Sequence, residues 1–290
     1  MTVGARRSWV LFVAPSLTFL VLFAIVPIVT AAVLSFFEWD LITDPEFIGL
    51  DNYRELTGDD EFHASISHTL LFIVGYVPTV MVAGLGLALM LNRRQRFLGL
   101  SRVVFFMPVV SAWVAVALIW TWMLNPRFGA VNWLLEGIGL DPPAWLFEEG
   151  WAMVAIVGVS VWKDAGFVML LFLAGLQAIP DSYREAALVD GANKVAAFRH
   201  VTLPLLSPTV FLVSIILLIN SFQVFEQVWI MTEGGPVGST TVIVQQIVKN
   251  AFGFGRLGYA AALSWVLFAM IFSVTLLQTR LQRRWVHYEL

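Results

Sequence analysis

Six long apolar runs place the strongest constraint on what this sequence can fold into. They lie near residues 9–37, 67–91, 103–124, 151–178, 205–231 and 259–279. A helix of about 20 predominantly apolar residues crosses the roughly 30 Å hydrocarbon core of a bilayer, and each run is long enough. Because lipid offers no partners to backbone N–H and C=O groups, such segments form helices. The pattern predicts an all-α membrane protein with six transmembrane helices in a single domain, residues 1–290.

The composition agrees with this class. Of the 290 residues, 59% are apolar and 13% are charged, and cysteine is absent. Soluble domains have about 45–50% apolar and about 25% charged residues, so one soluble core could not bury this much apolar surface. The composition excludes a disordered chain, a disulfide-stapled secreted domain and an ordinary cytosolic enzyme.

Prolines and flanking charges refine the predicted spans. Pro27, Pro78 and Pro108 lie inside three of the runs and predict kinks, which packed membrane helices tolerate. Arg6 and Arg7 precede the first run, as they would in a secretory signal. This run is longer than the usual signal core of about 7–15 apolar residues, so we expect a retained span.

The charged residues predict the orientation. Most of the 17 Lys and Arg residues fall on one side of the predicted membrane, namely Arg6, Arg7, Arg93, Arg94, Arg96, Arg102, Arg184, Lys194, Arg199, Arg280, Arg283 and Arg284. Basic residues concentrate on the cytoplasmic side, so both termini are expected there. Residues 38–61 are rich in Asp and Glu and are predicted to form a solvated outer loop. This loop is either a hydrophilic cap or a contact surface for an extracytoplasmic partner.

The segment between the fourth and fifth runs carries signals for two short helices joined by a hinge. Ser182 and Glu185 have the spacing of a capping box. Gly191 can adopt the left-handed backbone that ends a helix, and Asn193 can cap the next one. Pro204 prevents that second helix from running straight into the fifth span. From the residues alone, the segment is either an amphipathic hairpin on the membrane surface or a docking surface for a cytoplasmic protein.

An ordered set of residues between 181 and 204 identifies a family. The set comprises Glu185, Ala186, Ala187, Asp190, Gly191, Ala192, Val201, Thr202, Leu203 and Pro204. It resembles the cytoplasmic "EAA" loop of permease subunits of binding-protein-dependent ABC importers. The resemblance implies a coupling helix that fits a cleft on the ATP-hydrolysing subunit, with Glu185 at a polar contact and Gly191 at the bend. Phe198, Leu203 and Pro204 are included in this predicted ATPase-coupling surface.

Other stretches resemble the carbohydrate-uptake branch, the maltose-type and glycerol-3-phosphate-type permeases. They are Phe105–Pro108, Trp162–Lys163 with Gly166, Leu173–Pro180 and Phe222–Pro236. The resemblance covers nearly the whole chain, which is closer to the compact six-span form than to the maltose-type subunit with its extra spans and outer domain. It implies a bacterial plasma-membrane subunit that acts with a second, different permease chain, two ATP-binding subunits and an extracytoplasmic solute-binding protein.

Motifs for chemistry are missing from the sequence. A phosphate-binding loop needs GxxxxGK followed by Ser or Thr, but Lys163, Lys194 and Lys249 do not follow glycine. GxSxG and HExxH motifs are also absent, and His63 and His68 have poor metal-binding spacing. We expect no catalytic residue, metal or cofactor in this chain and no nucleic-acid partner, with ATP and Mg held by the partner ATPase.

Polar residues at membrane depth predict a substrate path, because an ionised side chain near the bilayer centre costs about 2.5–3.5 kcal/mol and usually faces a cavity or a partner. The predicted path residues are Trp162, Lys163, Asp164, Asn220, Phe222, Gln223, Glu226 and Gln227. Steps of three and four place Asn220, Gln223 and Gln227 on one face of a continuous helix. Trp162 and Phe222 offer flat surfaces that can stack on sugar rings. Alternatively, Lys163 and Asp164 neutralise each other or pair with another helix, and the amides join helices.

Together these features predict a permease subunit of an ATP-driven importer for a sugar or a related polyol or glycerol-phosphate solute. The alternatives are a six-span channel, an ion-coupled carrier or a membrane scaffold. A channel would show a filter-like sequence, and a proton-coupled carrier would place more ionisable residues at the midplane. A scaffold would not require polar groups along the fifth span.

Overall fold

The computed structural model of the chain describes residues 5–92, 98–283 and 286. Four arginines used to predict the orientation, Arg93, Arg94, Arg96 and Arg284, lie outside the described residues. The chain forms two compact units. The first contains the chain up to Phe62 together with Gln246–Ala269, and the second contains His63–Gln245 together with the chain from Met270.

The first unit joins an N-terminal helix to a small polar layer. Its elements are α1 (Ala5–Leu20), the π-helical segment η1 (Val21–Ile25), α2 (Val26–Leu34), β1 (Phe37–Glu38), β2 (Glu46–Phe47), α3 (Asp51–Gly58), η3 (Lys249–Gly253) and the first half of α15 (Leu257–Gln282). The two strands pair antiparallel, with Phe37 opposite Phe47. The segment predicted as an outer loop therefore contains a hairpin and a helix, which the sequence reasoning missed.

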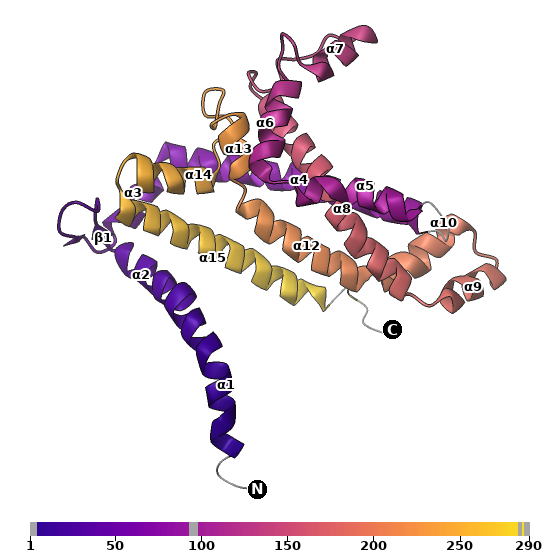
Figure 1. The fold of residues 1–290 in the computed structure, drawn as a ribbon, viewed down its shortest axis with the longest axis horizontal. Coiled ribbons are helices and arrows are strands. Elements are labelled where there is room, and N and C mark those ends of the chain that lie inside the picture. The colour runs from indigo at the N-terminus through magenta and orange to yellow at the C-terminus, as the bar shows by residue number, and fades with distance from the viewer. Residues whose placement is uncertain (1–4, 93–97, 284–285, 287–290) are drawn as a thin grey trace. The chain divides into compact units, whose positions relative to one another are not determined.

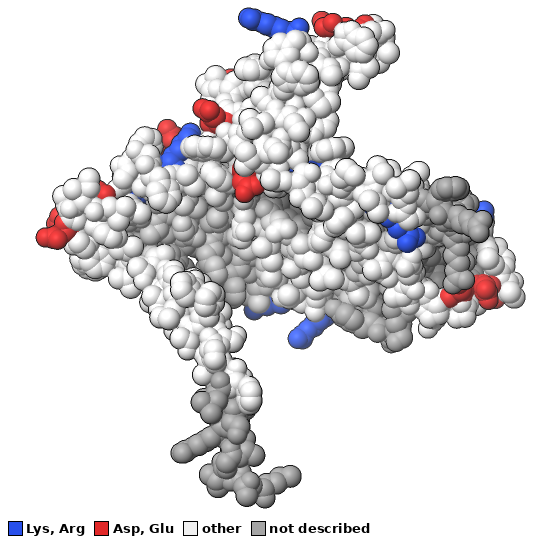
Figure 2. Space-filling model, viewed as in Figure 1, with Lys and Arg blue, Asp and Glu red and all other residues white. Residues whose placement is uncertain are grey.

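The second unit is a set of helices in which α5 and α12 lie beside α8 (Figure 1). Its elements are α4 (Asp60–Leu91) from His63 onward, α5 (Leu98–Val110), α6 (Trp113–Met123), α7 (Ala130–Gly137), α8 (Trp151–Ala178), α9 (Asp181–Val189), α10 (Lys194–Ala197), η2 (Phe198–Thr202), α11 (Leu203–Leu205), α12 (Ser207–Phe222), α13 (Glu226–Met231), the start of α14 (Ile243–Val248) and the second half of α15. Charged side chains are sparse over the long helices on the face shown in Figure 2, where white surface dominates.

Four helical stretches in the described residues are long and apolar enough to cross a membrane. They are Phe12–Leu34, Asp60–Leu91, Trp151–Ala178 and Leu257–Gln282. The third predicted span is broken, because α5 and α6 meet at 96°. The chain becomes extended at Ala112, four residues after Pro108, so the break lies beyond the predicted proline kink.

The fifth predicted span is also interrupted. The helical stretch Lys194–Leu205 meets α12 at 64°, and α12 ends at Phe222 before a new helix begins at Glu226. The prediction of one continuous helix over 205–231 was therefore wrong. The described residues therefore contain four unbroken candidate spans, or up to six if each bent pair counts as one.

Helix α8 forms the core of the second unit. Ile156, Val168 and Met169 are fully buried along its length. Gly166 lies directly against the carbonyl oxygen of Phe105, and a Cβ at this position would collide with that backbone. The glycine thus lets α8 and α5 approach at backbone distance, which positions the first half of the broken span against α8.

Candidate coupling loop and transport path

The candidate coupling loop, residues 181–204, begins with α9. The helix starts at Asp181, and its N-cap is Pro180, which makes no side-chain capping bond. The predicted capping box was wrong, because Pro180, two residues before Ser182, holds the cap position and Ser182 lies inside the first turn. Asp181 instead places a negative charge at the positive end of the helix dipole.

The hinge of this loop has the predicted geometry. Gly191 has a φ of +85°, in the left-handed region that favours glycine. Around it, the Ala192 N–H donates to the Ala187 carbonyl at 2.9 Å and the Gly191 N–H donates to the Leu188 carbonyl at 3.1 Å. These bonds satisfy carbonyls at the end of α9 and reverse the chain. The prediction that Gly191 ends the first helix is confirmed.

The second short helix is capped as predicted. The Asn193 side-chain oxygen accepts a 2.8 Å hydrogen bond from the Ala196 N–H. The helix then continues through η2 and α11, where Pro204 lies, and bends by 64° into α12. Thus the chain does not run straight into the fifth span, although the bend falls just after Pro204, at Leu206.

The surface of this loop presents both polar and apolar groups. Glu185, Ala186, Asp190 and Gly191 are exposed, Ala187, Ala192, Phe198 and Pro204 are half-buried, and Leu203 is exposed. Figure 2 shows acidic side chains gathered over α9. Val189 and Val195 are 86% and 74% exposed, and Leu188 is also exposed. Exposed apolar side chains favour an interaction surface. Sequence reasoning missed Leu188 and Val189, whose signal was two adjacent apolar residues at the end of a polar helix.

The two neighbouring charges on α8 point to different helices. The Tyr76 hydroxyl on α4 donates to the Asp164 Oδ2 at 2.8 Å. The Lys163 Nζ donates to the Val109 carbonyl on α5 at 3.1 Å and lies 4.9 Å from the centre of the Trp113 ring. Both side chains therefore pair with other helices, which was one of the two alternatives for them.

The predicted aromatic surfaces differ in accessibility. Trp162 is 47% exposed and packs edge-on against Trp120 of α6, with ring centres 5.3 Å apart. Phe222 is only 2% exposed, so the prediction that it offers a stacking surface was wrong. It is the last residue of α12, where the helix packs into the core before the chain turns.

The amides near the end of α12 do not share one helix face. Asn220, Gln223 and Glu226 are exposed, whereas Gln227 is buried. The prediction assumed a continuous helix, but α12 ends at Phe222 and the next helix begins at Glu226, after Phe225 adopts a φ of −152°. The structure thus keeps Asn220, Gln223 and Glu226 accessible and turns Gln227 inward.

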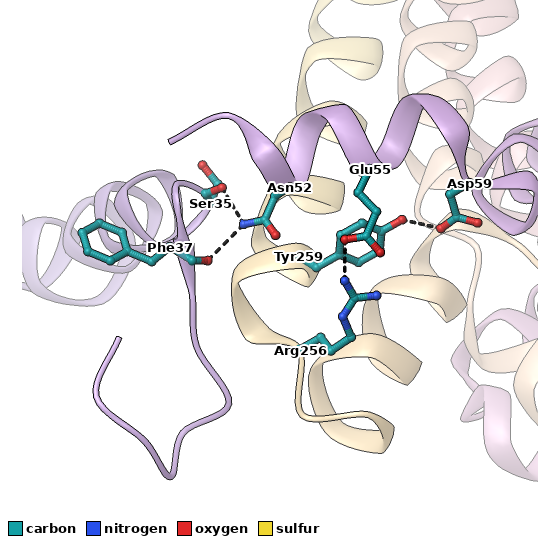
Figure 3. A network of polar contacts seen from close by, with 7 residues as sticks. All are labelled: Ser35, Phe37, Asn52, Glu55, Asp59, Arg256 and Tyr259. Atoms are coloured by element: carbon teal, nitrogen blue, oxygen red, sulfur yellow. Dashed lines mark hydrogen bonds and ion pairs between the residues drawn. The ribbon is translucent and has the colours of Figure 1, made fainter. Parts of the chain in front are cut away.

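A polar network holds the predicted outer segment in the first unit (Figure 3). The buried Asn52 side chain donates to the Ser35 and Phe37 carbonyls at 2.9 and 3.0 Å. The next two links in the network join α3 to the start of α15. Arg256 pairs with Glu55 at 2.5 Å, and the Tyr259 hydroxyl donates to Asp59.

Electrostatics stabilise this outer layer. The hydrogen bond that Arg256 donates to the Glu55 carboxylate raises the pKa of the guanidinium above its usual value. Backbone N–H groups of Thr43 and Ile42 lower the pKa of the Asp40 carboxyl, because they stabilise its charged form.

Beside the network lies a recess of about 420 Å³, lined by Glu55, Gly58, Asp59, Asp60, Glu61, Gln246, Asn250, Phe254 and Arg256. In the part of the chain that the structure describes, no group of three or more His, Cys, Asp or Glu residues could hold a metal ion. His68 instead lies with Nδ1 at 3.1 Å from the Thr241 carbonyl.

The chain combines long apolar helices, two bent helix pairs of membrane-span length, and a glycine-hinged hairpin between the fourth and fifth apolar runs. These features define a multi-span membrane permease. Residues 80–287 match the family described as "Binding-protein-dependent transport system inner membrane component", and the chain belongs to that family.

Relatives and a solved structure agree with the assignment. The chain is 35% identical to the sulfoquinovosyl glycerol transport system permease protein of Agrobacterium fabrum, over 98% of this chain and 92% of the relative. It is also 35% identical to the trehalose/maltose transport system permease protein of Thermococcus litoralis, over 94% and 92% of the two chains. Its fold matches a chain of a bacterial ABC transporter involved in the import of the acidic polysaccharide alginate, with a TM-score of 0.84, 25% identity and 97% of each chain covered.

Proposed function

We propose that this chain is the membrane-spanning subunit of an ATP-driven importer that takes up a sugar or a related polyol or glycerol-phosphate solute. The observation that carries the proposal is the candidate coupling loop, in which a left-handed Gly191 turns the chain between two short helices with an exposed Glu185–Ala186 edge. The family and the printed substrates of the relatives, a sulfoquinovosyl glycerol and trehalose or maltose, support a carbohydrate solute.

The complete transporter in this proposal contains five or more chains. A second permease, different from this one, completes the path, and two ATPase subunits bind ATP and Mg and dock on the candidate coupling loop. An extracytoplasmic binding protein delivers the solute, as the description of the family indicates. Six spans with both termini in the cytoplasm place the loop on the side of the ATPase, and the basic residues at span ends favour this orientation.

The mechanism follows from the two-part shape of the loop. Closure of the ATPase pair pushes α9, and the Gly191 hinge transmits the movement through α10 and η2 to the bend before α12. A segment with two stable arrangements, rather than a gradual bend, converts the push into inward- and outward-facing states. The chain itself is a transport component and hydrolyses no nucleotide.

In this proposal the solute meets the accessible polar groups at the end of α12. Asn220, Gln223 and Glu226 are exposed and can bond to sugar hydroxyls, and Trp162 offers a partly exposed ring. Phe222 and Gln227 are buried and act through packing, and Lys163 and Asp164 pair with neighbouring helices.

The test is purification of the tagged chain from its native membrane, followed by reconstitution. We expect an ATPase and a second permease to co-purify, and the reconstituted complex to take up a sugar only with ATP and the binding protein. Uptake driven by an ion gradient without ATP would favour a carrier. Passive solute flux would favour a channel, and absence of both flux and an ATPase would favour a scaffold.

A further inference from the structure

Among the residues whose side chains the structure describes (12–92, 99–183, 185–283 and 286), Lys163 is the only buried Lys, Arg, Asp or Glu, with 4% of its surface exposed. It lies in the middle of α8, in a segment predicted to cross the membrane. A buried ammonium is costly unless its donors find partners. Its partners therefore indicate what this residue does.

The Lys163 ammonium contacts both sides of the break in the third span. On one side it donates to the carbonyl of Val109, in the last turn of α5. On the other it lies over the ring of Trp113, the first residue of α6. The last carbonyls of a helix have no partners within it and carry partial negative charge. Because hydrocarbon supplies no water to them, a cation at this end stabilises the break.

The packing around Lys163 brings it to this position. Gly166, one turn further along α8, lets the backbone of α5 approach at Phe105. Asp164 bonds to Tyr76 on α4, so it is turned toward a different helix. The break itself leaves α6 at 96° to α5, and α6 packs against α13, which begins at Glu226.

We propose that Lys163 is a positioning residue that holds the break between α5 and α6 at its angle and thereby sets α6 against α13 and the accessible end of α12. It acts through Val109 and Trp113 and does not contact the solute. The role of Lys163 in fixing the angle between α5 and α6 is inferred from these contacts alone. The effect of that angle on solute uptake rests on the proposed function.

The test measures the angle of the break in the assembled transporter in lipid nanodiscs. Because the chain contains no cysteine, spin labels can be attached at Leu100→Cys on α5 and Ile119→Cys on α6, both exposed positions. At 1.5 Å per helical residue, arms of about 17 Å and about 11 Å that meet in the middle of the break at a bend of 96° place the two labelled backbones about 20 Å apart, against about 28 Å for a straight helix. Dipolar EPR resolves this difference.

In the parent chain we expect a narrow distribution of label-to-label distances near the shorter distance, the one calculated for the bent α5–α6 pair. Lys163→Met should lengthen and broaden it toward the straight value, and Lys163→Arg should restore it. Trp113→Leu should shift the distribution in the same direction and serves as a second variant if Lys163→Met fails to assemble. Ser160→Ala, a buried position one turn earlier whose hydroxyl bonds within α8, is the matched control and should leave the distances unchanged.

Uptake assays separate this proposal from the proposed function, because the distances between the spin labels are measured without solute and do not depend on transport. We expect Lys163→Met to lower the maximal uptake rate without weakening the apparent affinity for the solute, with recovery in Lys163→Arg. An unchanged distance distribution in Lys163→Met would overturn the proposal, and a loss confined to solute affinity would assign Lys163 to solute contact instead. If the parent chain takes up no sugar, only the proposed function fails.

Discussion

The hinge of the candidate coupling loop allows a graded perturbation at Gly191. Its φ is +85°, and a Cβ built there meets no atom within 4 Å. A substitution therefore acts through the backbone conformation alone and not through a clash. Gly191→Asn, Gly191→Ala and Gly191→Pro form a series of increasing incompatibility with this conformation, because Asn tolerates the left-handed region and proline is restricted to a φ near −65°.

The expected magnitude follows from the conformational cost. A residue with a Cβ in the left-handed region loses about 1–2 kcal/mol relative to glycine. This free energy corresponds to a factor of about 5–30 between the hinged and unhinged conformations. We expect Gly191→Ala to reduce uptake per ATP hydrolysed by about this factor, Gly191→Asn by less, and Gly191→Pro to abolish coupling while the subunit remains inserted.

The assay is solute uptake and ATP hydrolysis measured together in proteoliposomes that contain the whole transporter. Gly158→Ala on α8 is the matched control, since this glycine has neither a positive φ nor a neighbour within 4 Å of its Cβ. Normal uptake by Gly191→Pro would refute the reasoning. Equal losses of uptake per ATP hydrolysed in Gly191→Ala and Gly158→Ala would show that the effect does not arise from the hinge.

Three further perturbations test other parts of the structure. Glu185→Ala should leave the subunit in the membrane with its ATPase active but uncouple hydrolysis from uptake, and unimpaired uptake in vesicles would contradict this role. Gln223→Leu should raise the KM for solute because this amide is exposed, whereas Gln227→Leu, at a buried amide, should change thermal stability instead. The same rise in KM in both variants would contradict the proposal that only the exposed polar residues at the end of α12 contact the solute. Gly258→Ala should lower the unfolding temperature, at a cost of about 1–3 kcal/mol, because its Cβ would collide with the Phe37 carbonyl, and an unchanged melting curve would show that this contact is not tight.

Local signals made the candidate coupling loop predictable. A glycine after a helical segment and an asparagine before the next one act over three or four residues, and both Gly191 and Asn193 have the predicted geometry. The capping box failed on the same scale, since the helix starts two residues earlier than predicted and Pro180, rather than Ser182, holds the cap position. Helix ends of this kind are the least reliable part of a sequence pattern.

The substrate path was less predictable, because its geometry depends on contacts between distant segments. Helical spacing placed Asn220 and Gln227 on one face, but α12 ends at Phe222 and a new helix begins at Glu226, which separates them. The burial of Phe222 likewise depends on neighbouring helices rather than on its own segment. In the third span, apolar composition gave no sign of a break beyond Pro108.

The sequence by itself determined that the chain belongs in a bilayer, where its apolar runs lie and how its hinged loop turns, because hydrophobicity and turn chemistry act locally along the chain. Only the tertiary structure decided which polar groups are accessible and which are paired. Lys163 and Asp164 are adjacent in sequence, yet successive residues on a helix point about 100° apart, and they bond to α5 and α4 respectively. Their roles depend on which helices pack around α8, and this packing arises from close backbone contacts such as that at Gly166.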